Sequence, residues 1–91
     1  MSLDDFKENL EKIKVLSADY DRLIKKKEGI DLSIRNLKAK YRENKIEREI
    51  FSEYNKEIDS LSKDIQTARD EILKLIYKNS IIISEEMKDV I

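Results

Sequence analysis

The sequence contains no cysteine, histidine, proline or tryptophan, and it has a single glycine. Without cysteine and histidine, a disulfide framework, a zinc site, a thiol nucleophile and an imidazole base are all excluded. One glycine is too few for a phosphate-binding loop or a dinucleotide-binding turn. We therefore expect a protein that binds no cofactor and no metal ion and is not an enzyme.

Long apolar runs are also missing. The longest unbroken run is Ile81-Ile82-Ile83, whereas a membrane-spanning helix needs about 20 apolar residues. We also expect no secretory signal peptide before the fold. We therefore expect a cytoplasmic protein without a transmembrane segment.

The sequence is instead rich in charged and aliphatic residues. Of its 91 residues 43% are charged, with a net charge of −1, and 40% are hydrophobic. Chains rich in Ile, Leu, Lys and Glu and poor in helix breakers are typical of long helices and coiled coils. We expect an all-α fold in which residues 1–91 form one domain.

The first apolar stripe predicts a helix over about residues 3–43. Its steps of three and four residues keep the side chains on one face, and from residue 16 onward they follow a seven-residue repeat with Lys27 as one member. Such a repeat predicts a supercoiled partner helix. The stripe comprises Leu3, Phe6, Leu10, Ile13, Leu16, Tyr20, Leu23, Ile30, Ile34, Leu37 and Tyr41.

Gly29 lies inside this predicted helix, where a glycine costs about 1 kcal/mol relative to alanine. The simplest interpretation is a tolerated, mildly flexible point. A break into two helices and close packing against a partner are the alternatives.

The second apolar stripe predicts a helix over about residues 47–78. Its positions do not continue the three- and four-residue spacing of the first stripe, which indicates a break between the two. Asn44 can adopt the left-handed conformation that ends helices. We therefore predict a turn near 44–46 and a long antiparallel helical hairpin, with Leu16 opposite Leu75. The second stripe comprises Phe51, Tyr54, Ile58, Leu61, Ile65, Ala68, Ile72 and Leu75.

The polar residues Lys78-Asn79-Ser80 predict the end of the second helix and a short C-terminal tail over 79–91. The start of the first helix would then extend beyond the hairpin as an apolar overhang. Either the tail or a second chain must cover this overhang, since its burial contributes several kcal/mol at about 25 cal/mol per Å². The candidate partner contacts are Leu3, Phe6, Leu10, Ile13, Tyr77, Ile81, Ile82 and Ile83.

The expected function is that of a coiled-coil interaction or assembly module. Two helices bury too little apolar surface to be stable alone, and additional apolar residues widen both stripes: Ile24, Ile50, Leu73 and Ile76. This pattern predicts self-association into a helical bundle through the heptad seams and the overhang. The partner would be a second copy or a different helical protein, and a three-helix monomer is the remaining architecture.

An alternative function is electrostatic binding of nucleic acid or an anionic membrane. It would use the basic face of the first helix, comprising Lys25, Lys26, Lys27, Arg35, Lys38, Lys40, Arg42 and Lys45. Acidic residues are interleaved with these cations, so a solvated helix face is the simpler interpretation and nucleic acid is not the expected partner. Glu53 and the acidic residues around it could also be considered as metal ligands. The simpler interpretation is that they form ion pairs with lysines one helical turn away, such as Lys56. No motif identifies a family.

Overall fold

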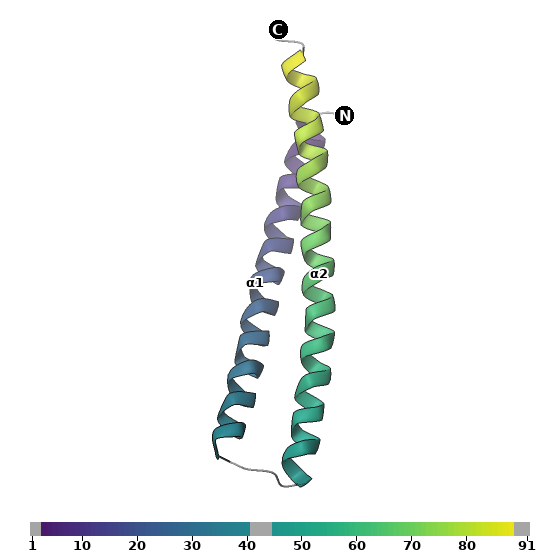
Figure 1. The fold of residues 1–91 in the computed structure, drawn as a ribbon. Helices are drawn as coiled ribbons and strands as arrows, with labels where there is room; N and C mark the ends of the chain where they lie inside the picture. The colour runs from purple at the N-terminus through teal and green to yellow at the C-terminus, as the bar shows by residue number, and fades with distance from the viewer. Residues whose placement is uncertain (1–2, 41–44, 89–91) are drawn as a thin grey trace. The chain divides into compact units, whose positions relative to one another are not determined.

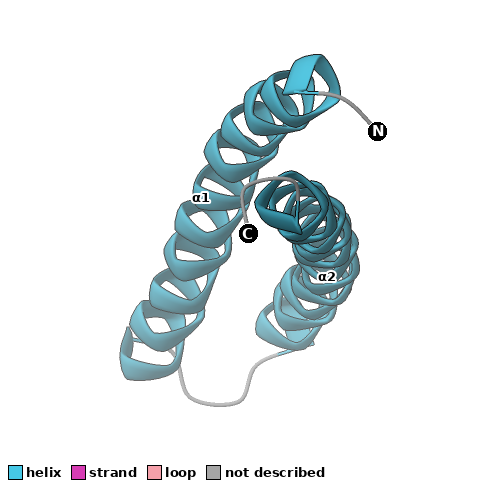
Figure 2. Cartoon of the chain, turned by 90° about the horizontal axis from the view of Figure 1, so that it is seen from above, coloured by secondary structure: helices cyan, strands magenta, loops and turns pink. Residues whose placement is uncertain are grey.

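The computed structural model describes residues 3–40 and 45–88 of the chain. Two helices account for all of these residues: α1 spans Leu3–Lys40 and α2 spans Lys45–Lys88 (Figure 1). The described residues therefore contain no strand, as Figure 2 also shows. The predicted all-α helical hairpin is confirmed.

The chain divides into two compact units, each of which combines part of α1 with part of α2. The terminal unit comprises residues 1–20 and 67–91, and the middle unit comprises residues 21–66. In both units the stretches of α1 and α2 run in opposite directions.

In the middle unit, the residues of the two apolar stripes form the buried seam. Ile30 and Leu61 are buried, because apolar residues at heptad spacing present one continuous face to the other helix. Lys27 is half-buried within this seam, and its aliphatic stem can cover apolar surface while its ammonium group reaches water. The other described stripe residues are also half-buried: Leu23, Ile34, Leu37, Phe51, Tyr54, Ile58 and Ile65. Tyr41 lies outside the described residues.

In the terminal unit, the seam continues beyond the point at which the sequence predicts that it ends. Ala68 is buried, and Ile82 is the most completely buried side chain of the described residues, with only 1% of its surface exposed. The neighbouring stripe residues are half-buried: Phe6, Ile13, Leu16, Tyr20, Ile72 and Leu75. The start of α1 therefore packs against α2 of the same chain through Phe6 and Ile13, while Leu3 and Leu10 remain exposed.

The predicted end of the second helix near residue 78 is corrected, because α2 continues to Lys88. Asn79 and Ser80 do not interrupt it, since their side chains find hydrogen-bond partners within the helical structure: Asn79 on α1, and Ser80 on the Tyr77 carbonyl at 2.8 Å. The last residues of the predicted tail, 89–91, lie outside the described residues.

The predicted turn near 44–46 falls partly outside the described residues, which omit 41–44. Lys45 and Ile46 are the first two residues of α2 rather than part of the turn. The predicted end of the first helix at residue 43 also lies outside the described residues. The last described residue of α1 is Lys40.

Gly29 neither breaks α1 nor packs closely against a described neighbour. The helix is continuous through this position, and a Cβ atom added to Gly29 would meet nothing within 4 Å. Its carbonyl accepts a hydrogen bond from the Ser33 hydroxyl at 3.0 Å. An exposed glycine inside a helix lowers the stability only because its backbone loses more conformational entropy on folding than that of other residues.

Replacement of Gly29 by alanine should therefore stabilise the protein by up to about 1 kcal/mol. The measurement is urea-induced unfolding followed by circular dichroism at a fixed protein concentration. The matched control is the reverse change at an exposed helical position, Ala18→Gly, which should destabilise by a similar amount. A destabilising Gly29→Ala would contradict an unstrained, open helical site.

Candidate interaction surface

A buried asparagine lies in the seam of the terminal unit. Only 5% of the Asn79 surface is exposed, and its side chain bonds to α1 at two points. Its Oδ1 accepts a hydrogen bond from Asn9 Nδ2 at 2.9 Å, and its Nδ2 donates to the Phe6 carbonyl oxygen at 3.3 Å. The amide is therefore satisfied across the helix pair, as a buried polar group requires.

The Asn9–Asn79 hydrogen bond shows that the predicted register is wrong in this unit. An alignment with Leu16 opposite Leu75 would place Asn79 opposite Lys12, about one helical turn from its partner Asn9. Two heptad stripes can be aligned in several registers that all bury apolar residues. The hydrogen-bonded pair distinguishes between them, because a shifted register would leave the buried amide of Asn79 without Asn9.

Sequence reasoning missed both asparagines as seam residues. The predicted stripe passes through Leu10, which is exposed, whereas the half-buried residue is Asn9. The signal was present: the seven-residue repeat, extended backward from Leu16 and Ile13, reaches residue 9. Extended forward from Leu75, it reaches residue 79.

Replacement of either asparagine by leucine should destabilise the protein by about 1–3 kcal/mol, because it leaves the other amide without its partner. The double variant Asn9→Leu/Asn79→Leu should recover this loss, since two apolar groups replace the bonded pair. Urea unfolding of all four proteins at one concentration gives the coupling energy.

The matched control is the exposed Asn55, whose change to leucine should alter the free energy of unfolding by less than about 0.5 kcal/mol. Purely additive effects of the Asn9 and Asn79 substitutions would show that the two side chains do not form the pair.

Beside this seam lies an apolar face built from both helices of the terminal unit. We use the name apolar face for six exposed side chains around Ser80: Leu3, Leu10, Leu73, Ile76, Ile83 and Met87. Two shallow grooves of about 320 and 260 Å³ run along it. The second groove contains no charged residue in its lining.

The candidate partner contacts are distributed over three environments. Ile82 is buried in the seam, and Phe6 and Ile13 are half-buried in the grooves. Leu3, Leu10 and Ile83 belong to the apolar face. Tyr77 and Ile81 line a depression of about 560 Å³ that is formed by α2 alone and borders the apolar face at Leu73.

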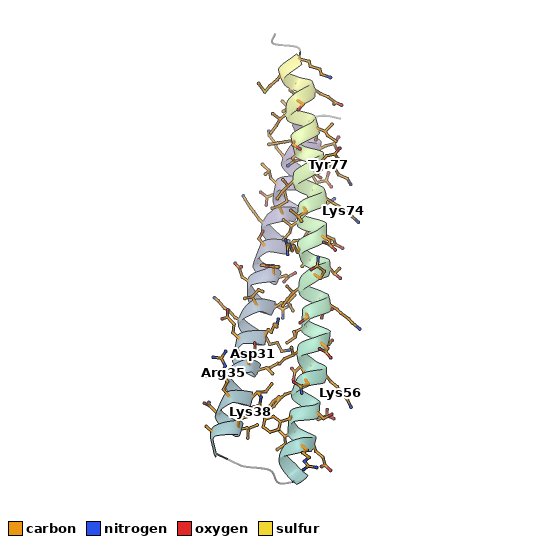
Figure 3. All side chains as sticks on the ribbon, in the orientation of Figure 1. Asp31, Arg35, Lys38, Lys56, Lys74 and Tyr77 are labelled. Carbon is orange, nitrogen blue, oxygen red and sulfur yellow. The ribbon has the colours of Figure 1, made fainter. Side chains whose placement is uncertain are left out.

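Tyr77 is the most exposed of these side chains, at 67%. Figure 3 labels it together with Lys74, which lies one turn before it on α2. Between Ile72 and Ile83, α2 therefore carries apolar side chains on the side that packs against α1 and on the apolar face. On its outer side, Tyr77 and Ile81 lie among the exposed Lys74 and Lys78.

The described cations of the basic stretch do not form one face. Lys25 and Lys26 are exposed, whereas Lys27 lies in the seam. Lys26 and Arg35 are nine residues apart, which places them on opposite sides of α1. Figure 3 shows Asp31 on the same stretch of helix as Arg35 and Lys38. The side chains of Lys40, Arg42 and Lys45 lie outside the described part of the chain.

The acidic residues pair with nearby lysines along each helix. Glu53 and Lys56 form the predicted ion pair, with Oε1 and Nζ 3.8 Å apart. Lys12 bonds to Glu8 at 3.3 Å and Lys14 to Glu11 at 3.2 Å. These pairs are exposed and contribute at most a few tenths of a kcal/mol each. In the described ranges, no three acidic side chains come together as a metal site would require.

Neither α1 nor α2, as far as they are described, contains a stretch apolar enough to cross a membrane. No protein-family model, curated protein or solved structure matches the chain. Inferences about function therefore depend on the surface of the molecule.

Proposed function

We propose that this protein is a non-enzymatic coiled-coil assembly module that self-associates through the apolar face of its terminal unit. The observation that carries this proposal is the exposure of large apolar side chains around α2, from Leu73 to Met87, outside the seam with α1. Such a contiguous patch on a small protein marks an interaction surface.

The energetics support association. The described core is small, since its buried apolar residues are Ile30, Leu61, Ala68 and Ile82. Domains with so small a buried core commonly gain stability from oligomerisation, a metal or disulfides. Covering six half-exposed side chains contributes about 1 kcal/mol each, and a homodimer obtains this contribution from both copies. The total is comparable with the cost of association, about 4–15 kcal/mol.

The shape of the surface supports a protein partner rather than a substrate. The grooves of the apolar face are shallow and lined mainly by aliphatic side chains, with Glu86 as the one charged group in their lining. Small-molecule sites enclose most of the ligand and place several polar groups around it. A groove between two helices instead fits the apolar side of a third helix.

A lysine in the apolar face should weaken self-association. Ile83→Lys should raise the dissociation constant of a homodimer by at least about 30-fold, because the loss of about 1 kcal/mol of burial occurs in both copies. Leu73→Lys, at a more peripheral position of the same face, should act in the same direction. The molar mass is measured by light scattering after gel filtration, over a hundredfold range of concentration.

The matched control is Leu32→Lys in the middle unit. Leu32 is 57% exposed, compared with 46% for Ile83 and 51% for Leu73, so all three substitutions place a lysine at an exposed aliphatic position. Circular dichroism establishes that each variant remains helical. A wild-type protein that is monomeric at every concentration, or a mass that is unchanged by Ile83→Lys and Leu73→Lys, would contradict the proposal.

A further inference from the structure

We infer that two copies pack with their α2 helices antiparallel, crossing at Ser80, so that the terminal units form a four-helix bundle. This inference rests on the proposed function, because it specifies the partner and the geometry of the same surface. It follows from the spacing, hydrogen bonding and charge of the residues along α2.

The apolar residues of α2 are arranged nearly symmetrically around Ser80. Leu73 and Ile76 lie seven and four residues before it, and Ile83 and Met87 lie three and seven residues after it. A two-fold axis at Ser80 therefore places Leu73 of one copy beside Met87 of the other, and Ile76 beside Ile83. Such self-complementarity is what an interface between identical subunits requires.

This stripe lies about a quarter of a turn around α2 from the seam, at 100° per residue. A helix with two contact faces at this angle fits the corner of a square four-helix bundle. Leu3 and Leu10 of α1 lie beside Ile83 and Ile76 in the grooves, so they widen the apolar surface along the same side of the bundle.

Ser80 is suited to the centre of such an interface. Its side chain is small enough for two helices to approach closely, and its hydroxyl already donates a hydrogen bond to the Tyr77 carbonyl at 2.8 Å. A polar group that is satisfied within its own helix can be buried at low cost.

The charge and the flank of the stripe are also compatible with a second copy. None of the stripe positions carries a charge, so two copies meet without like-charge repulsion. Tyr77 and Ser84 lie on the same flank of the stripe, about equally far from Ser80. In the antiparallel pair, the exposed ring of Tyr77 in one copy would therefore lie over Ser84 of the other.

Disulfide trapping tests this geometry, since the natural chain contains no cysteine. Ser80→Cys places the two thiols together at the crossing point. Ser84→Cys is the matched control on the same helix, because an antiparallel crossing at residue 80 separates its two thiols by about 12 Å along the helix axis at 1.5 Å per residue. Disulfides require Cα atoms within about 7 Å.

Each variant is equilibrated in a glutathione redox buffer at micromolar concentration, and the covalent dimer is quantified on non-reducing gels. Ser80→Cys should form at least 10-fold more covalent dimer than Ser84→Cys.

The possible failures are distinguishable. Equal trapping of both variants would indicate parallel helices, and weak trapping of Ser80→Cys would indicate a different crossing point. Either result overturns this geometry, although a wild-type dimer that Ile83→Lys disrupts would still support the proposed function. A wild-type monomer at all concentrations would overturn both.

Discussion

The hydrogen bond between Asn9 and Asn79 is the interaction on which the arrangement of the terminal unit depends. A seam of aliphatic residues can slide by a turn and remain apolar, so hydrophobic burial alone does not specify one register. The paired amides do, because a shift of α2 along α1 would separate the buried Asn79 side chain from both of its partners, Asn9 and the Phe6 carbonyl. Two asparagines bury less apolar surface than two leucines would, but they define one alignment of the helices. This is a known role of polar residues in helical seams.

This alignment determines which side chains remain outside. With Asn79 beside Asn9, the last turns of α2 cover the start of α1, and Ile82 becomes fully buried. The same geometry brings Ile76 and Ile83 of α2 beside Leu10 and Leu3 of α1 in the shallow grooves. The surface that we propose for self-association is therefore a consequence of the register.

The helices and most of their seam could be predicted from sequence, because heptad spacing depends only on the positions of apolar residues. Stripe members such as Leu61 and Ala68 are buried in the structure. The end of α2 could not be predicted in this way, since Lys78-Asn79-Ser80 resembles a helix stop when each side chain is considered alone. Only the contact with α1 shows that Asn79 belongs inside the helix. For the same reason, the sequence predicts that the start of the first helix extends beyond the second helix, whereas α2 continues alongside it.

The most direct measurement of the central claim is the exchange of asparagine side-chain amides with solvent, observed by NMR on asparagine-labelled protein. The Asn79 amide protons should exchange much more slowly than those of the exposed Asn36 and Asn55, and they should show nuclear Overhauser contacts to Asn9 and Phe6. If the Asn79 amide exchanged as fast as those of Asn36 and Asn55, with no contact to Asn9, then another interaction would set the register.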